Sequence, residues 1–172
     1  MAKITVFLGN PGLQYRNTRH NVAWLFCDYL KERGVLPNSG WQEKFHSEFL
    51  RTTGGMIILK PLTYMNLSGR SVQEAASFFR VKTEDILVVH DDIELDFGII
   101  KLQKGGGMGG HNGLRSVKQT LSSDVFMRLR LGLGRPQIQE VSSYVLSGFS
   151  PEEKTGLQKM FARAEDLYKT FI

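Results

Sequence analysis

The stretch ITVFLGNPG, Ile4 to Gly12, sets the expectation for the fold: a continuous apolar run stops abruptly at residues suited to a tight turn. An uninterrupted apolar run is typical of a strand buried on both faces, as in a parallel sheet. A second run, Ile86 to His90, repeats the pattern and leads directly into four acids between Asp91 and Asp96. Because open parallel sheets carry ligands at the carboxyl ends of their strands, we expect chemistry after both runs.

Segments with helical periodicity alternate with these strands. We expect helices at His20–Gly34, Asn66–Arg80, Asn112–Leu121 and from Ser150 to Tyr168. The last helix begins with a capping box, Ser150 and Glu153, around Pro151. Further strands are expected at Gly98–Lys104, at Phe126–Leu133 and in a hairpin over His46–Lys60 that turns at Gly54-Gly55. The alternation predicts a single α/β domain over residues 1–172, with a twisted mixed, largely parallel sheet and helices on both faces.

The composition excludes several classes of protein. The chain has 172 residues, of which 41% are hydrophobic and 23% charged, which is unlike disordered, collagen-like or coiled-coil proteins. Its one cysteine, Cys27, can form neither an intramolecular disulfide nor a thiolate metal cage. No apolar run reaches the length of a signal-peptide core or a membrane span. We therefore expect a cytoplasmic protein with no membrane partner.

The positive charge is concentrated in one part of the chain. The stretch from Lys101 to Arg135 contains seven Lys and Arg residues and one acid, Asp124, whereas the whole chain carries a net charge of +5. The alternation along Phe126–Leu133 predicts that Arg128 and Arg130 share one face of a strand. A concentrated basic surface suits a polyphosphate partner such as a nucleic acid. A solvated basic face with no partner remains the alternative.

Six glycines lie between Gly105 and Gly113. Glycine lets the backbone approach a ligand closely or adopt positive φ. The segment lacks the Lys-Ser/Thr ending of a P-loop, and it fits a dinucleotide fingerprint poorly. We therefore expect no nucleotide cofactor, and a mobile surface loop is the alternative interpretation.

His20 is a candidate general base, because an imidazole held by a carboxylate can deprotonate water near neutral pH. Asp91 and Asp92 are available as that carboxylate, and no Ser or Cys lies in a recognisable nucleophile motif. A purely structural role for His20 is the alternative. The acidic run itself could hold Mg²⁺, as in a metal-dependent phosphohydrolase, or form a solvated turn.

Asn10, Asn66 and Asn112 each lie at the end of an expected strand or the start of an expected helix. An amide offers a donor and an acceptor without charge, which suits holding a carbonyl and stabilising the oxyanion that develops on it. Singly, these residues are ordinary turn residues, so they gain significance only from one another.

Five blocks of sequence together resemble the bacterial-type peptidyl-tRNA hydrolases. The blocks are Leu8–Asn21, Lys60–Gly69, His90-Asp91, Gly105–Gly113 and Arg128–Pro136. They span nearly the whole chain in the family's order. The resemblance implies a monomeric enzyme without cofactor or metal that cleaves the ester between a peptide and the 3′-terminal ribose of tRNA. The partner implied is peptidyl-tRNA, through its acceptor stem and 3′ end.

The resemblance also assigns roles to residues. It makes His20 the general base, Asp91 its orienting carboxylate, and Asn10 a catalytic-site residue that helps to distinguish a blocked from a free amino group. It places Tyr15 and Tyr64 at the tRNA-end site, where their rings could stack on a base. The other residues that it assigns to substrate or tRNA binding are Asn21, Met65, Asn66, Gly110, His111, Asn112, Lys101, Lys104 and Arg130.

Two positions depart from the family pattern. Gln103 stands where a second lysine is expected, and Met108 interrupts the glycines where a small or polar residue is commoner. The competing interpretation is a non-catalytic RNA-binding relative with the same fold. Retention of both His20 and Asp91 favours the enzyme.

Overall fold

The computed structural model describes residues 2–172, in which seven strands form one sheet. The strands are β1 Ile4–Phe7, β2 Gln42–Lys44, β3 Ser47–Arg51, β4 Ile57–Pro61, β5 Ile86–Asp92, β6 Ile100–Lys104 and β7 Met127–Gly132. Their order is β2-β3-β4-β1-β5-β7-β6. The central strands β4, β1, β5 and β7 are mutually parallel, whereas β3 and β6 run antiparallel to their neighbours. The predicted mixed, largely parallel sheet is confirmed.

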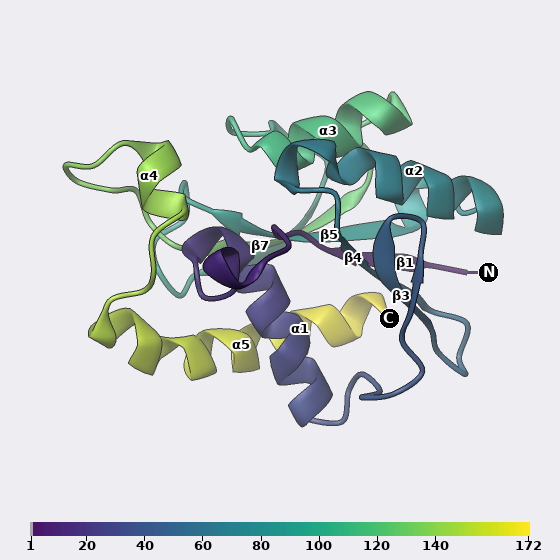
Figure 1. Ribbon diagram of the computed structural model, residues 1–172, viewed down its shortest axis with the longest axis horizontal. Coiled ribbons are helices and arrows are strands. Elements are labelled where there is room, and N and C mark those ends of the chain that lie inside the picture. The colour runs from purple at the N-terminus through teal and green to yellow at the C-terminus, as the bar shows by residue number, and fades with distance from the viewer. Residues whose placement is uncertain (1) are drawn as a thin grey trace.

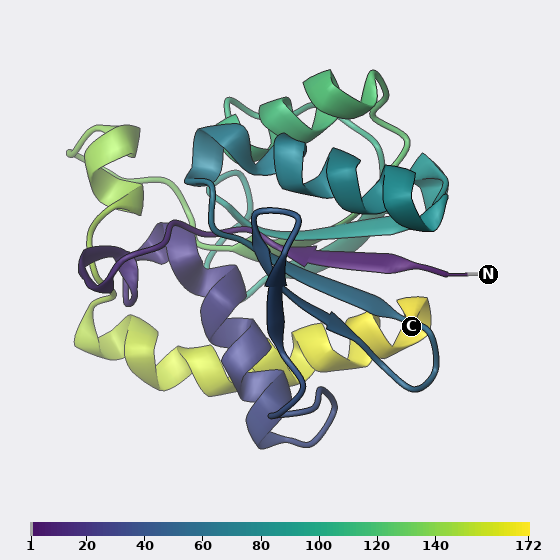
Figure 2. The same ribbon diagram turned by 45° about the vertical axis from the view of Figure 1, so that its right-hand side comes forward.

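Helices cover both faces of the sheet, as predicted. They are α1 Val22–Glu32, α2 Ser68–Phe79, α3 Asn112–Leu121, α4 Val141–Val145 and α5 Pro151–Phe171. In Figures 1 and 2, α2 and α3 lie on one side of the sheet and α1 and α5 on the other. Alternate residues of β5 supply the two cores: Leu87 and Val89 pack with α1 and α5, and Ile86 and Val88 with α2 and α3. This period of two is what a strand buried on both faces requires.

Most element boundaries agree with the sequence pattern. The capping box of Ser150 and Glu153 is confirmed at the start of α5, and the hairpin of β3 and β4 is confirmed. The strand and helix that the sequence did not predict, β2 and α4, are short and lack buried residues, so no apolar periodicity marks them. The prediction that β5 stops at His90 was wrong, because the strand continues through Asp91 and Asp92.

Two glycines allow close approaches that shape the site. A Cβ at Gly69 would overlap the Ser116 carbonyl oxygen, so only glycine lets α2 pack this closely on α3. A Cβ at Gly113 would lie 2.5 Å from Met65 Sδ and 2.9 Å from Leu8 Cδ1. Gly113 thereby brings the N-terminus of α3 against the ends of β1 and β4.

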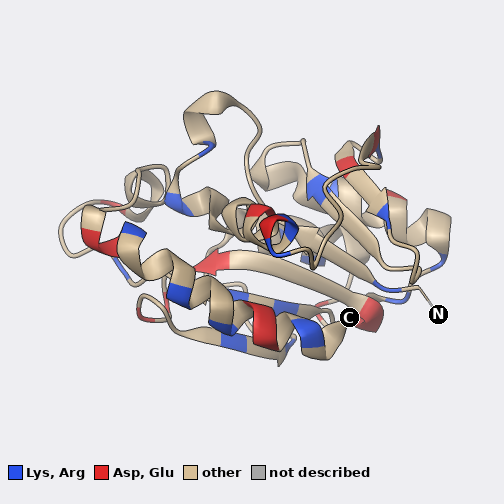
Figure 3. Ribbon diagram, turned by 90° about the horizontal axis from the view of Figure 1, so that it is seen from below, with Lys and Arg blue, Asp and Glu red and all other residues tan. Residues whose placement is uncertain are grey.

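The predicted concentration of positive charge does not form one continuous basic surface. Arg128 is 3% exposed, and Arg130, Arg135 and Lys118 each pair with a carboxylate. Along α5, Figure 3 shows basic segments interspersed with acidic ones. Within residues 2–172, the basic residues of the stretch that make no ion pair are Lys101, Lys104 and Arg115. No helix within residues 2–172 has the length and hydropathy to cross a membrane.

Candidate active site

The carboxyl ends of the parallel strands bring the expected residues together. Asn10 follows β1, Met65 follows β4, and Asp91 lies near the end of β5. His20 lies in a short helical turn, Arg19–Asn21, directly before α1. A cavity of about 500 Å³ opens here, lined by His20, Asp91, the glycine segment, Arg130 and one side of α4. The site therefore lies where parallel sheets place their ligands.

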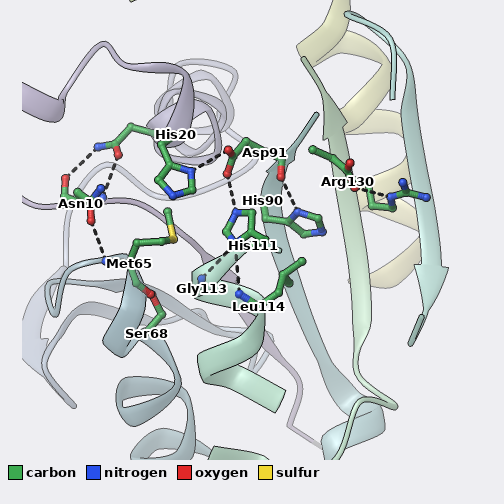
Figure 4. Close-up of polar contacts among 12 residues, drawn as sticks. Asn10, His20, Met65, Ser68, His90, Asp91, His111, Gly113, Leu114 and Arg130 are labelled. Atoms are coloured by element: carbon green, nitrogen blue, oxygen red, sulfur yellow. Dashed lines mark hydrogen bonds and ion pairs between the residues drawn. The ribbon is translucent and has the colours of Figure 1, made fainter. Parts of the chain in front are cut away.

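His20 and Asp91 make direct contact. The His20 Nδ1–H donates to Asp91 Oδ2 over 2.7 Å, and Asp91 is 2% exposed (Figure 4). A carboxylate can only accept, so the contact places the proton of neutral His20 on Nδ1. Nε2 then carries a lone pair, and no group within residues 2–172 bonds to it. This is the tautomer that a general base requires.

His111 is the second partner of Asp91. Its Nε2–H donates to Asp91 Oδ1 over 2.7 Å, and its Nδ1 accepts from the backbone N–H groups of Gly113 and Leu114 at 3.1 and 3.2 Å. Two donors aimed at Nδ1 leave no room for a proton there, so the proton lies on Nε2. His111 thereby caps α3 and holds the carboxylate of Asp91 from the side opposite His20.

The pKa values of the pair follow from burial and charge. Burial lowers the pKa of His20, but the charge of Asp91 and its hydrogen bond outweigh burial, so that pKa is raised above its ordinary value. Burial would raise the pKa of Asp91, yet its interactions with His20 and His111 hold that pKa well below the usual range. Asp91 therefore stays ionised beside a histidine whose protonated form it stabilises.

The trio of His20, Asp91 and His111 has the ligand types of a metal site, and its ligand atoms lie within 4.8 Å of one another. The donor chemistry does not fit a metal. A histidine that binds metal through Nε2 carries its proton on Nδ1, but at His111 two backbone N–H groups occupy that position. The geometry thus favours a hydrogen-bonded relay over the metal-dependent phosphohydrolase alternative.

His90 and Arg128 form a buried layer beneath the site that sequence reasoning missed. The His90 Nδ1–H donates to the Asp91 carbonyl oxygen over 2.8 Å, and the Arg128 Nε–H donates to His90 Nε2 over 3.2 Å. Burial, together with the nearby Arg128 charge, lowers the pKa of His90 to about 3. Arg128 also donates to the carbonyls of Gly105 and Gly107. A histidine and an arginine at inward positions of neighbouring apolar strands were the available signal.

Asn10 and Asn21 are bonded to each other and to the segment after β4. The Asn10 N–H donates to Asn21 Oδ1 and the Asn21 amide donates to the Asn10 carbonyl, both over 2.9 Å. Met65 N–H donates to Asn10 Oδ1 over 2.7 Å. These bonds fix the Asn10 side chain with its Nδ2 unpaired within residues 2–172, and Nδ2 is not among the fully buried unpaired atoms. Asn21 is fully buried, and both of its side-chain hydrogen bonds go to the backbone of Asn10.

The remaining predicted substrate residues lie around this centre. Asn66 and Asn112 are exposed at the starts of the helical segments Met65–Leu67 and α3, and Gly110 is exposed in the glycine segment. Tyr15 and Tyr64 pack edge to face with ring centroids 6.3 Å apart, and Tyr64 is half-exposed. Met65 is buried, so its side chain packs in the core while its backbone holds Asn10.

The predicted tRNA-binding cations differ in their surroundings. Lys101 and Lys104 are exposed on β6. The Arg130 Nε–H donates to Asp92 Oδ2 over 2.7 Å, and its Nη1 donates to Gln103 Oε1 over 2.8 Å. Gln103, where a lysine was expected, therefore orients Arg130. Met108, the other departure, is buried in the core beneath α2 and α3.

Comparison with known proteins finds related sequences and a related crystal structure. A family model described as peptidyl-tRNA hydrolase matches residues 4–172. A peptidyl-tRNA hydrolase of Treponema pallidum is 46% identical, with 96% of this chain and 84% of the relative covered, and one of Geotalea uraniireducens is 43% identical, with 99% and 90% covered. The crystal structure of the Acinetobacter baumannii peptidyl-tRNA hydrolase superposes with a TM-score of 0.83 at 34% identity, covering 95% of this chain and 87% of that one. The chain therefore belongs to the peptidyl-tRNA hydrolase family.

Proposed function

We propose that this chain hydrolyses the ester joining a peptide, or an N-blocked amino acid, to the 3′-terminal ribose of tRNA, with His20 as the general base. One observation carries the assignment of His20. Its Nδ1 is hydrogen-bonded to Asp91 at 2.7 Å, whereas its Nε2 has no hydrogen-bond partner within residues 2–172, and the ring lines the cavity. Family membership makes the chain a hydrolase and supports catalysis over the non-catalytic RNA-binding alternative.

The reaction requires one proton acceptor that later becomes a proton donor. His20 Nε2 removes a proton from water as the water oxygen bonds to the ester carbonyl carbon, and the carbonyl oxygen becomes an oxyanion. When the bond to the ribose oxygen breaks, the proton on Nε2 passes to that oxygen. The products are a free peptide acid and tRNA with a free hydroxyl. Asp91 stabilises the imidazolium that exists between these two transfers.

Asn10 is suited to hold the ester carbonyl or the neighbouring amide. Its oxygen is occupied by Met65 N–H, so the group left for substrate is a neutral N–H donor. A neutral donor stabilises an oxyanion or binds an amide carbonyl without requiring a charged substrate amine. Asn66 and Asn112, exposed on two adjacent segments, add further amide groups at the rim.

The tRNA moiety is expected to run from the site toward β6. Lys101 and Lys104 on this strand are exposed and make no ion pair within residues 2–172, so they can contact acceptor-stem phosphates. Arg130 has its charge partly neutralised by Asp92 and contributes less. The edge-to-face pair of Tyr15 and Tyr64, in which Tyr64 is half-exposed and Tyr15 partly buried, offers a ring face for the terminal base.

The experiment that tests this function is hydrolysis of N-acetylaminoacyl-tRNA, with the unblocked aminoacyl-tRNA as the control substrate. We expect release of the blocked amino acid that survives exhaustive EDTA treatment, and much slower release of the unblocked one. Equal cleavage of both substrates would contradict the role of Asn10. Absence of cleavage would contradict the function itself.

Cys27 is fully buried, and burial raises the pKa of its thiol to about 12, so it is inert as a nucleophile.

We further propose that the enzyme acts as a monomer in the cytoplasm. Sedimentation at the enzyme's assay concentration tests the first proposal, with a single 19.5 kDa species expected.

A further inference from the structure

The short helix α4 forms one wall of the cavity, yet it has no buried residue of its own. Its residues Val141, Ser142 and Val145 line the space beside His20 and His111. No α4 residue belongs to either hydrophobic core, and α4 stands apart from the two helix layers in Figures 1 and 2. Its position therefore depends on contacts made by Tyr144 and by residues just beyond its C-terminal end.

Arg19 makes most of those contacts. Its Nη1 donates to Ser147 Oγ over 2.5 Å, its Nη2 pairs with Glu153 Oε1 over 2.6 Å, and its guanidinium lies 4.1 Å from the Tyr144 ring centroid. The Arg19 backbone N–H also donates to the Ser147 carbonyl over 3.0 Å. The same Glu153 oxygen accepts from Ser150 N–H, so the contacts join the end of α4 to the start of α5.

The arrangement fixes position at some cost in stability. Arg19 is 8% exposed, and its Nε–H is the buried side-chain group within residues 2–172 that has no hydrogen-bond partner. A buried unpaired donor costs free energy. Besides the Arg19 side chain, this region is held by the Tyr144 hydroxyl, which donates to the Leu133 carbonyl over 3.1 Å, and by backbone contacts of Arg19 with Ser147 and of Thr18 with Gly148. Loss of the Arg19 side chain would leave α4 itself held by the Tyr144 hydroxyl, with the two backbone contacts lying beyond its C-terminal end.

We propose that Arg19 is a positioning residue, which holds α4 as a wall of the substrate cavity at a fixed position relative to the general base. The positions of α4 and His20 are directly linked, because Arg19 and His20 are consecutive residues of the same helical turn, Arg19–Asn21. The inference rests on the proposed function, since it assigns the cavity beneath α4 to the substrate. Arg19 touches neither the ester nor the attacking water. It acts through Val141, Ser142 and Val145.

The matched test compares Arg19→Gln with Arg33→Gln. Arg33 also joins the α1 region to α5, through Glu165 Oε2 at 3.0 Å, but at the end of α1 remote from His20. For Arg19→Gln we expect KM for N-acetylaminoacyl-tRNA to rise about tenfold, as loss of one charged hydrogen bond implies, with kcat and its pH midpoint nearly unchanged. Amide exchange over residues 141–148 should accelerate. Arg33→Gln should change neither KM nor that exchange.

A cross-link provides a rescue that a general loss of stability would not show. Thr18 and Gly148 pair in an isolated antiparallel bridge, and paired residues of such bridges lie within the reach of a disulfide. In the Arg19→Gln background, Thr18→Cys with Gly148→Cys should restore KM when oxidised and lose the gain on reduction. An oxidised form with slow exchange but an unrestored KM would overturn the proposal.

The exchange measurement separates this inference from the proposed function. If the wild type failed to cleave the ester, the function would fail, while faster exchange over residues 141–148 in Arg19→Gln would still support the anchoring of α4. If Arg19→Gln kept both the wild-type KM and the wild-type exchange, the positioning role would be refuted whatever the reaction.

Discussion

The replacement Asp91→Asn tests the tautomer that the site imposes on His20. An asparagine side chain has one acceptor and one donor where Asp91 has two acceptors. The ring N–H of His111 cannot move, because Gly113 and Leu114 donate to its other nitrogen. The oxygen of the new amide must therefore face His111, and the amide N–H then faces His20 Nδ1. This drives the His20 proton to Nε2, where no lone pair remains to accept a proton from water.

The magnitude follows from what is lost. A general base contributes about 10²–10⁴-fold to the rate, or about 3–5 kcal/mol, so kcat in Asp91→Asn should fall by that factor while tRNA affinity stays unchanged. Among the remaining active molecules, the pH at which the rate reaches half its maximum should move lower. The reason is that burial still lowers the pKa of His20, whereas the charge that raised it is gone.

A second substitution separates the tautomer from the charge. His111→Asn keeps a side chain that can cap α3 but removes the ring N–H that competes for the amide oxygen introduced by Asp91→Asn. In the double variant Asp91→Asn/His111→Asn that oxygen can turn to His20, and the rate should recover roughly tenfold over Asp91→Asn alone. The assay is single-turnover cleavage of N-acetylaminoacyl-tRNA. A double variant slower than Asp91→Asn would refute the reasoning.

Three further predictions concern metal, RNA and acid. Exhaustive EDTA should leave cleavage of a small ester mimic unchanged, because His111 presents a proton to any metal; a loss restored by Mg²⁺ would revive the metal site. Lys101→Gln or Lys104→Gln should each lower the salt dependence of tRNA binding by about 0.7–0.9 in log–log slope, and an unchanged slope would point to packing damage instead. Asp91→Asn should lower the melting temperature at neutral pH, because a carboxylate whose pKa is depressed in the folded state stabilises the protein at pH values above its unfolded-state pKa. The difference in melting temperature from wild type should shrink as the pH falls below about 4. A difference that grew in acid would contradict this linkage.

The parts of the fold that the sequence predicted are those that bury a regular apolar pattern. The strands β1 and β5 are runs buried on both faces, and the helices α2, α3 and α5 place apolar residues at helical spacing. The helix α4 and the strand β2 lack any such pattern, because tertiary contacts and not burial hold them. The contacts that a single side chain such as Arg19 makes with distant residues cannot be predicted from the periodicity of apolar residues.

The sequence predicted that Asn10, His20 and Asp91 would lie near one another, but not the hydrogen bonds that join His20, Asp91 and His111. Parallel strand ends indicated where Asn10 and Asp91 would meet, and the spacing of a helix start indicated His20. The carboxylate shared by His20 and His111 depends on how Arg128 of β7 holds the glycine segment that leads to His111, which sequence spacing does not encode. Arg128 was counted as surface charge, but its guanidinium is buried between His90 and the carbonyls of that segment.

The most direct test of the central claim is the turnover of His20→Ala with tRNA affinity measured in the same preparation. If His20 is the general base, kcat on N-acetylaminoacyl-tRNA should fall by about 10²–10⁴-fold, with the dissociation constant for tRNA unchanged because Lys101 and Lys104 are untouched. Turnover within a few-fold of wild type, from a folded protein that binds tRNA normally, would contradict the account.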